Sequence, residues 1–401
     1  MNDKIVVLAH VPTKELTDGI IPTMIKRDIP VILLTDVPGQ YNNFITQYHE
    51  QITLVACDVF NPITVINVLT DYQIKPLGVF SNSDHLQTST SIVAEFYQLA
   101  GKNWHVTQLT KNKHLMRQHL LSAGLSNMWQ YMANTMATLK QLLPKLSYPL
   151  IIKPCLGVAS QGVKLIMDKK QLIDYCQKAW QESPCALLLE KYIEGTLYSI
   201  ETLGNGYQIQ VLGGFETRIG KPPYFIETGA TWQNEFNHYI TQQLLQQLDY
   251  LGVNFGACHT EFVFDRHTNS VEIIEANYRC AGDNRAFLLD KIYGENYFDC
   301  LIDLYLGEKS IHLQKSFNAG QIEFFVADKS GFITDHPCDY TKQLKNQLQC
   351  FNAIKQTHDH IQLSHSNKDY LGILQVIGKD QALIEQTINK EKEKLCWQIK
   401  E

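Results

Sequence analysis

The chain has 401 residues, 44% of them hydrophobic, and a formal net charge of -6 at pH 7. A chain of this length and composition can bury a sizeable core and is long enough for two or three domains. Acidic and basic residues are mixed along the sequence without a basic stripe, which excludes the electrostatic pattern of a nucleic-acid-binding protein.

The cysteines and the apolar segments indicate a cytoplasmic protein. The first twelve residues lead directly into a strand-like run, without the apolar stretch and small-residue cleavage site of an export signal. No segment approaches the ~20 consecutive apolar residues that span a bilayer. The ten cysteines show no CxxC pair and no metal-type spacing. We therefore expect reduced, buried thiols, a cytoplasmic location and no membrane partner.

The first hundred residues alternate short β-branched runs with amphipathic stretches. This alternation is typical of a parallel sheet with helices on its faces. Four strands are predicted, at residues 5–9, 31–35, 52–56 and 77–81. The loop after the first strand has no GxGxxG motif, so we expect no dinucleotide there.

Strands dominate the middle of the chain after one predicted helix. This helix covers residues 111–124 and ends in a glycine, which suits a helix C-terminus. A proline-bearing connection follows, and then come strands at residues 150–154 and 186–193 and a strand pair with a glycine kink within 206–219. A second helix is predicted near residues 234–251.

A hairpin is predicted at residues 259–277, because two apolar strand-like segments flank a polar Arg-His-Thr-Asn-Ser turn. Beyond residue 310, a last block has strand-like runs of its own at residues 320–327 and 370–377.

The hairpin carries two acids and an amide that can share one face. Alternation puts Glu275 and Asn277 on the same side of their strand, and a hairpin register can bring Glu261 beside them. Three oxygen ligands of this kind suit Mg²⁺, which shares its remaining positions with nucleotide phosphates. The alternative is that each side chain faces solvent, but both acids lie in otherwise apolar strands.

Three other segments have residues suited to a nucleotide. Lys153 ends a buried apolar strand, and the small-residue loop after it lets backbone N–H groups approach phosphates closely. Lys113, on the first predicted helix, is a second candidate for a phosphate contact. The strand end at residues 190–193 can present backbone groups to an adenine edge. Taken singly, the three also fit a strand end with a glycine turn, a solvated helix face and a plain strand exit.

The order of these segments resembles the ATP-grasp superfamily. The most specific part is HTEFVFDRHTNSVEIIEANYRCAGD (259–283), which is similar to the HxE strand and E-x-N-x-R ending of ATP-grasp ligases that couple amino acids. The segment PPYFIETG (222–229) is similar to the PxFVExG stretch of the carboxylate–amine ligase branch, which includes L-amino acid ligases and carnosine-synthase-like enzymes.

The resemblance implies an α/β and α+β architecture in three domains. Residues 1–110 would be an N-terminal parallel α/β (pre-ATP-grasp) domain, and residues 111–310 the ATP-grasp domain that binds nucleotide and metal. Residues 311–401 would be a small C-terminal α+β domain that closes the active site.

The resemblance also implies a role for each matching residue. ATP would be bound by residues on four segments: Lys113, Lys153, Ser160, Gln161, Gly162, Glu190, Lys191 and Ile193. Mg²⁺, or Mn²⁺ in its place, would be bound by Glu261, Glu275 and Asn277. Arg279 would be the catalytic residue and a substrate contact, because it would neutralise the transferring phosphoryl group and the acyl phosphate. Glu227 would contact a substrate amino group.

Two departures affect this assignment. In these families the turn after the adenine strand commonly reads G-P-E and its Glu binds the ribose hydroxyls, whereas this chain has Leu197 at that position. Glu194 and Glu201 are the candidates to replace it. The familiar N-P-R is N-Y-R here, with Tyr278 in place of proline. The metal ligands and the arginine are intact, so we expect activity to survive.

The implied activity is that of an ATP-dependent carboxylate–amine ligase, which forms an amide through an acyl phosphate from a small-molecule acid and amine. The alternatives are another ATP-grasp chemistry, such as carboxylation or thioester formation, and a nucleotide-binding scaffold that has lost catalysis. The architecture is compatible with a homodimer. Lone histidines are more often structural than functional, but three are candidates for the substrate cleft: His10, His85 and His259.

Overall fold

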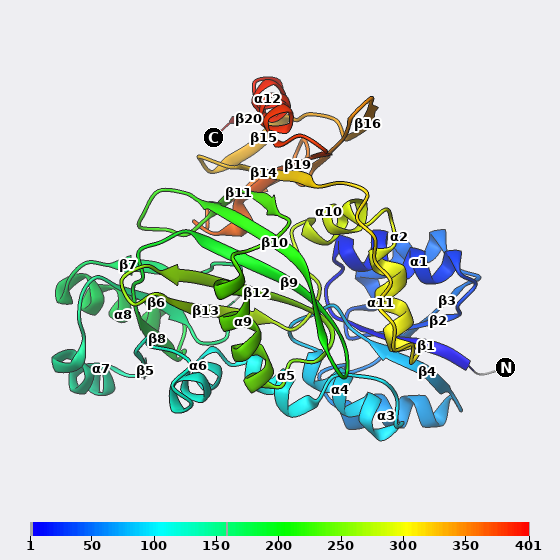
Figure 1. Ribbon diagram of the computed structural model, residues 1–401, viewed down its shortest axis with the longest axis horizontal. Helices are drawn as coiled ribbons and strands as arrows, with labels where there is room; N and C mark the ends of the chain where they lie inside the picture. Colours follow the sequence, from blue (N-terminus) through cyan, green and yellow to red (C-terminus); the bar gives the residue numbers. More distant parts are fainter. Residues whose placement is uncertain (1–2, 158, 401) are drawn as a thin grey trace.

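The computed structural model, which describes residues 3–157 and 159–400, begins with a parallel sheet of strand order β3-β2-β1-β4 (Figure 1). Its strands are β1 (Asp3–Ala9), β2 (Val31–Thr35), β3 (Ile52–Ala56) and β4 (Lys75–Phe80). The helical segments of this part are η1 (Glu15–Ile20), α1 (Ile21–Lys26), η2 (Pro38–Tyr41), α2 (Asn42–Gln47), α3 (Pro62–Asp71) and α4 (Gln87–Phe96). The predicted parallel sheet is confirmed, with the fourth strand beginning two residues earlier than expected.

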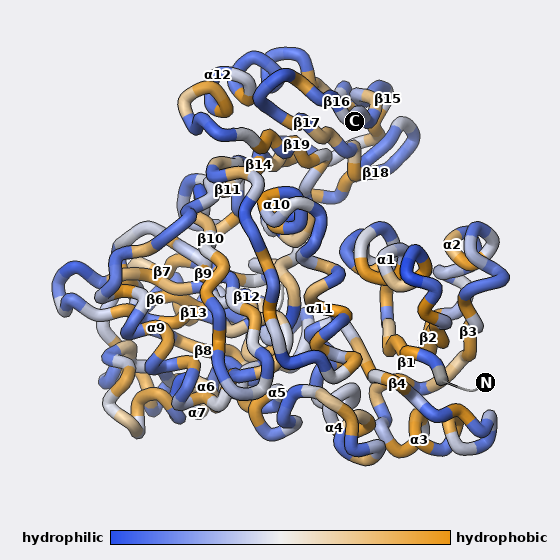
Figure 2. Tube along the Cα trace, turned by 45° about the vertical axis from the view of Figure 1, so that its right-hand side comes forward, coloured by the Kyte–Doolittle hydropathy of each residue, from blue (hydrophilic) through white to orange (hydrophobic). Residues whose placement is uncertain are grey.

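Both faces of this sheet are buried. Val7 packs into one apolar cluster with η1 and α1, whereas Leu8, on the opposite face, packs into another with α3 and α4. A parallel strand covered on both sides must be apolar throughout, which explains the unbroken hydrophobic runs of the sequence. Figure 2 shows these runs as hydrophobic colouring along β1 and β2.

The helix predicted at residues 111–124 is in fact two helices. α5 (Trp104–Lys111) ends before Asn112, and α6 (Lys113–Ser122) begins directly after it. The side-chain oxygen of Asn112 accepts hydrogen bonds from two free backbone N–H groups in the first turn of α6. This N-cap starts the new helix and puts Lys113 at its first position.

An antiparallel sheet of order β5-β8-β6-β7 follows. Its elements are β5 (Gln130–Ala133), α7 (Met136–Leu142), η3 (Leu143–Lys145), β6 (Leu150–Pro154), β7 (Lys164–Ile166), α8 (Lys169–Glu182) and β8 (Leu187–Lys191). Along β6, Leu150 and Ile152 point into the core under α7 and α8, whereas Ile151 and Lys153 face the other way. The alternation of a strand thus supplies one face for packing and one for the site.

The largest sheet has nine antiparallel strands in the order β13-β12-β9-β10-β11-β14-β19-β17-β16. They are β9 (Leu197–Asn205), β10 (Ile209–Ile219), β11 (Glu227–Gln233), β12 (Phe255–Asp265), β13 (Ser270–Asn277), β14 (Ala319–Val326), β16 (Tyr340–Leu344), β17 (Gln347–Ala353) and β19 (Tyr370–Gly378). The predicted glycine kink is present at Gly213, where the β9–β10 register shifts and a side chain would collide with Trp232. Because β14 pairs with β11, the C-terminal block extends this sheet.

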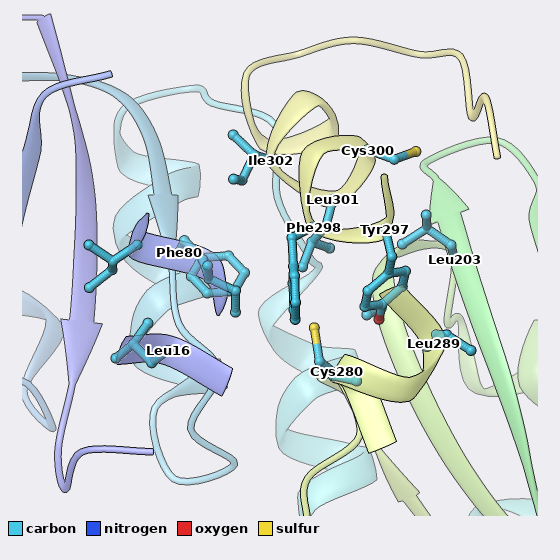
Figure 3. Close-up of a cluster of buried hydrophobic side chains, with 14 of the residues drawn as sticks. Leu16, Phe80, Leu203, Cys280, Leu289, Tyr297, Phe298, Cys300, Leu301 and Ile302 are labelled. Atoms are coloured by element: carbon cyan, nitrogen blue, oxygen red, sulfur yellow. The ribbon is translucent and has the colours of Figure 1, made fainter. Parts of the chain in front are cut away.

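The remaining elements connect or cover these sheets. They are α9 (His238–Leu251), α10 (Arg285–Ile292), α11 (Tyr297–Tyr305), β15 (Gly331–Asp335), β18 (His360–Ile361), η4 (Asn367–Asp369), α12 (Gln381–Lys392) and β20 (Gln398–Lys400). α11 contacts both β4 and β12. Figure 3 shows this junction, where Phe80, Phe298, Tyr297 and Leu203 belong to one buried cluster. That cluster joins the N-terminal sheet to the nine-stranded sheet.

No helix within residues 3–157 and 159–400 is both long enough and apolar enough to cross a bilayer.

Candidate active site

A cavity of about 300 Å³ lies between the β5-β8-β6-β7 sheet and the β12–β13 hairpin. Ten of the residues predicted from the sequence line it: Lys113, Lys153, Ser160, Gln161, Glu190, Lys191, Ile193, Glu227, Glu261 and Glu275. Much of the remaining wall is apolar and includes Met128, Ile151, Leu197, Val263 and Ile274. Residues separated by more than a hundred positions in the sequence therefore meet in one cleft with charged and apolar parts.

The paired acids of the hairpin lie opposite each other, as expected. Glu261 is the direct cross-strand partner of Glu275 in the register of β12 and β13. Two carboxylates at opposing positions repel each other unless a cation is near. Lys113 Nζ lies 2.7 Å from Glu275 Oε1, and His259 Nε2 lies 3.5 Å from Glu261 Oε1. Each acid thus has its own cationic partner within the chain.

His259 is held in place by a second carboxylate. Its Nδ1 lies 2.6 Å from Oε1 of Glu201, and the Ser199 hydroxyl donates to the same oxygen at 2.9 Å. Burial opposes the charged form of His259, but Glu201 and Glu261 overcome it and raise its pKa to about 10. Burial also favours the neutral form of Glu261, yet His259 lowers the pKa of that acid below its ordinary value. Glu261 is therefore held as a carboxylate.

The donor set of the hairpin fits Mg²⁺. Glu261 and Glu275 offer hard carboxylate oxygens, and Asn277 follows on the same face of β13 as Glu275. Asn277 lines a smaller cavity of about 20 Å³, which shares Lys113 and Glu275 with the larger one. Among the described residues, no three or more His, Cys, Asp or Glu side chains are grouped as a metal cluster. With two carboxylates and one amide as ligands, the Mg²⁺ ion would keep coordination positions for phosphate oxygens and water.

Lys113 lies at the charged part of the cavity. Its Nζ donates to the Gly157 carbonyl oxygen at 2.8 Å as well as to Glu275. Burial would lower the pKa of Lys113, but Glu275 more than compensates and the pKa is raised. The lysine is therefore a fixed cation, positioned by the N-cap of α6.

The loop after β6 has a backbone suited to anions. Ala159 and Ser160 have φ values of 54° and 55°, and Gly162 has a φ of 69°. These residues make a tight turn, and a turn can direct successive backbone N–H groups toward an anion. Ser160 and Gln161 line the cavity, whereas Gly162 does not; its carbonyl oxygen accepts a hydrogen bond from Tyr175 at 2.6 Å.

The side chains of the strand end at β8 are engaged with other protein groups. Lys153 Nζ lies 2.6 Å from Glu190 Oε2, and the Gln130 side-chain amide donates to the other oxygen. Burial would raise the pKa of Glu190, but Lys153 holds it below its ordinary value. Lys191 Nζ lies 3.1 Å from Asp265. The backbone of β8 is itself paired with β5 and β6, so the cavity-lining backbone outside this pairing is that of Tyr192 and Ile193, directly after the strand.

Glu227 is buried and has two partners that the sequence did not reveal. Its Oε1 accepts a hydrogen bond from Asn367 Nδ2 at 3.1 Å, and its Oε2 accepts one from Arg285. Burial raises the pKa of Glu227, although Arg285 opposes this. The Asn367 backbone N–H also donates to the Ala159 carbonyl oxygen at 3.2 Å. The C-terminal block therefore reaches both Glu227 and the loop after β6.

Arg279 lies outside the lining of both cavities. Its Nε and Nη2 are 2.7 Å and 2.6 Å from Oδ2 of Asp84, which follows β4. Asn82 accepts a hydrogen bond from the Cys280 backbone N–H, and Lys102 donates one to the Tyr278 carbonyl oxygen. Residues near the end of β4, together with Lys102, thus hold the segment after β13. Functional residues often follow the carboxyl ends of parallel strands, and that rule could have identified Asp84.

Neither acid suggested as a replacement for the ribose-binding Glu lines the cavity. Glu201 is buried and bonded to His259 and Ser199, and Glu194 is exposed outside the lining. Leu197 does line the cavity. Glu201 is therefore engaged elsewhere, whereas Glu194 stays a prediction, since its neighbours Ile193 and Gly195 both line the cavity.

Comparison with known proteins links this site to a family. The family described as an ATP-grasp domain matches residues 146–286. A protein of Sinorhizobium fredii called uncharacterized protein y4rH is 25% identical over 270 residues, which are 64% of this chain and 54% of that protein. The carbamoyl phosphate synthase large chain of Thermoanaerobacter sp. is 26% identical over 162 residues, 39% of this chain and 15% of that protein. The chain thus spans about half of the first relative and a small part of the second.

Solved structures share the whole fold. The L-amino acid ligase from Bacillus licheniformis has a TM-score of 0.80 at 17% identity and covers 100% of both chains. The phosphoribosylglycinamide synthetase from Anaerococcus prevotii has a TM-score of 0.73 at 15% identity, covering 99% of this chain and 100% of that one. A biotin carboxylase from Campylobacter jejuni has a TM-score of 0.70 at 14% identity, covering 98% and 92%. At such identities these likenesses establish the fold alone.

The matched residues 146–286 include the loop after β6, the end of β8 and the acidic hairpin, and the complete chain has the fold of these enzymes. Residues 146–286 of the chain therefore form an ATP-grasp domain.

Proposed function

We propose that the protein is an ATP-dependent carboxylate–amine ligase, acting through an acyl phosphate on an amino acid or another small carboxylic acid. The observation that carries the proposal is the single cavity in which Lys113, the paired acids Glu261 and Glu275, and the buried acid Glu227 all meet. Glu227 is neither a predicted metal ligand nor, like Glu190, a predicted nucleotide contact, and binding an amino substrate would give this buried carboxylate a function.

The apolar part of the cavity would hold the adenine ring between side chains such as Ile193 and Ile274. The backbone directly after β8 would hydrogen-bond its edge. Lys113 and the N–H groups of the loop after β6 would bind the phosphates. Mg²⁺ or Mn²⁺, bound by Glu261, Glu275 and Asn277, would offset the charge on the phosphates and orient the γ-phosphoryl group.

The substrate carboxylate would attack the γ-phosphorus, forming a P–O bond while the bond to ADP breaks. Glu227, with its oxygens fixed by Arg285 and Asn367, would bind an amino group of the acid being activated. An amine would then attack the acyl phosphate, and the C–O bond to phosphate would break as the amide forms. Arg279 stays a prediction as catalytic residue, since its guanidinium would have to exchange Asp84 for the acyl phosphate.

Phosphate release with MgATP and a mixture of the twenty common amino acids tests this proposal, with peptide products identified by mass spectrometry. ATP turnover should depend on the amino acids and should be lost in Glu275→Ala. Turnover without amide products, or none with any carboxylate, would contradict the proposal. A homodimer and a cytoplasmic location remain predictions.

One other chemistry has specific support. Carbamoyl phosphate synthase large chains match this chain over stretches such as the 162 residues above, so activation of a simpler carboxylate such as bicarbonate is the second candidate. ATP turnover that depends on bicarbonate and not on amino acids would favour it.

A further inference from the structure

Of the three histidines that the sequence offers as candidates for the substrate cleft, the structure leaves one with a free ring. His259 is fixed between Glu201 and Glu261, and Nδ1 of His10 lies 2.8 Å from Asp36. His85 is exposed, and among the described residues its imidazole has no hydrogen-bond partner. It lines the smaller cavity, next to the segment that carries Asn277.

This smaller cavity adjoins the larger one. Both cavities are lined by Lys113, Gly157 and Glu275. The volume of about 20 Å³ exceeds the roughly 10–15 Å³ that a single water needs, so it admits an amino group and not a whole amino acid. His85 and Leu156 form an exposed rim, over which the rest of an amine could extend into solvent.

Ligation requires a proton acceptor at this place. An α-amino group has a pKa near 7.7–8.0 or higher, so much of the amine arrives as an ammonium ion without a nucleophilic lone pair. Lys111 and Lys113 in the cavity wall act as hydrogen-bond donors, to the His85 carbonyl oxygen and to Glu275. Glu275 is bonded to Lys113, and Asp84 is bonded to Arg279. Among the described side chains of this wall, His85 is therefore the one suited to take a proton near pH 7.

The surroundings keep His85 neutral. Although His85 is exposed overall, the groups packed around its ring partly exclude water, and this desolvation lowers its pKa; the charge of Lys111 on α5 lowers the pKa further. The charge of Asp84 raises the pKa of His85, whereas the charges of His10 and Arg279 lower it. A neutral imidazole at pH 7 is the form that a general base needs.

We propose that His85 is the general base of the amide-forming step, an inference that rests on the ligase function proposed above. One proton passes from the ammonium group to the imidazole, which becomes imidazolium. The freed lone pair forms the C–N bond at the acyl carbon, and the C–O bond to phosphate breaks, its electron pair leaving with the phosphate. The second proton of the nitrogen passes to the departing phosphate.

A comparison of two nucleophiles tests this role. Hydroxylamine is largely unprotonated at neutral pH and needs no base, whereas amino acids do. His85→Asn should form hydroxamates from MgATP, hydroxylamine and the mixture of common amino acids within about threefold of the wild-type rate. Its peptide formation from the same mixture without hydroxylamine should fall on the order of 100-fold. His49→Asn, which removes an exposed histidine of the N-terminal domain with 72% side-chain exposure, is the matched control and should change neither rate.

The pH profile provides a second measurement. Wild-type peptide formation should reach a plateau above the lowered pKa of His85, whereas in His85→Asn it should keep rising up to the pKa of the amine. Equal losses of hydroxamate and peptide, no loss of peptide, or a wild-type profile without the plateau would overturn the assignment. Absence of both products from the wild-type protein would instead overturn the ligase function, and the role of His85 with it.

Discussion

Two cations on one face of α6, Lys113 and Arg117, pair with two acids of β13, yet they should behave differently when removed. Arg117 is buried against Glu272, with both side chains at most 2% exposed, and it also donates to the Ile273 carbonyl oxygen. Lys113 pairs with Glu275, whose side chain is 24% exposed at the cavity. One pair is structural and the other lies in the site, so the two residues form a matched comparison.

Arg117→Met should destabilise the protein by about 3–5 kcal/mol, the range for breaking a buried ion pair by removal of one partner. Glu272 would keep its hydrogen bonds from the Ser126 hydroxyl at 2.6 Å and the Asn127 backbone N–H at 2.8 Å, which favours the lower end. At an unfolding entropy of about 2.1 cal/mol/K per residue, a chain of 401 residues shifts by roughly 1.2 °C per kcal/mol, so a loss of 3 kcal/mol lowers Tm by roughly 4 °C. Adding Glu272→Gln should recover part of this loss, because the buried charge is then gone.

Lys113→Met should cost about 1 kcal/mol or less in stability, because water can solvate Glu275 at the cavity. MgATP binding should weaken roughly 10- to 100-fold, as expected from the ~1.5–3 kcal/mol of a hydrogen bond to a charged group. Thermal unfolding and calorimetric titration with MgATP measure the two quantities. Equal destabilisation by the two substitutions, or unchanged MgATP binding by Lys113→Met, would refute the reasoning.

Three further predictions concern the proposed metal ligand Glu261, the predicted substrate contact Glu227 and the buried Lys102. Glu261→Gln should lower ATP turnover on the order of 100-fold while leaving metal-free nucleotide binding nearly unchanged, which titration with and without Mg²⁺ checks; equal loss in both titrations would count against a metal role. Glu227→Gln should raise KM for the activated amino acid more than KM for ATP, and the opposite order in steady-state kinetics would remove Glu227 from the substrate site. Burial lowers the pKa of Lys102 to about 8, against about 10.4 in the unfolded chain. At pH values between these two pKa values, Lys102 carries a proton in the unfolded chain but has released it in the folded chain. Lys102 therefore makes the free energy of unfolding rise with pH. The Tm of the wild type should therefore rise relative to the Tm of Lys102→Met from pH 8 to 10. A constant difference between the two Tm values would show that Lys102 keeps its proton.

Local sequence patterns determined the strands and the hairpin because their physical causes are local. β-branched runs predict β1, β2 and β3, and alternation placed Glu275 and Asn277 on one face. The break between α5 and α6 was missed, although Asn112 is a good helix cap, because amphipathic periodicity continues across it. Local sequence patterns also predicted no hydrogen-bond partner for Glu227, because Arg285 and Asn367 lie 58 and 140 positions from it in the sequence.

The amino-acid sequence by itself determined which chemistry is present: two lysines, a small-residue loop and paired acids in the order of an ATP-grasp domain. Only the tertiary structure decided which of these groups share a cavity and which are engaged elsewhere. Arg279 is bound to Asp84, Glu201 to His259, and His85 alone of the three candidate histidines keeps a free ring at a cavity. The physical reason is that hydrogen bonds and ion pairs between distant segments depend on how sheets and helices pack, and no local pattern encodes that packing.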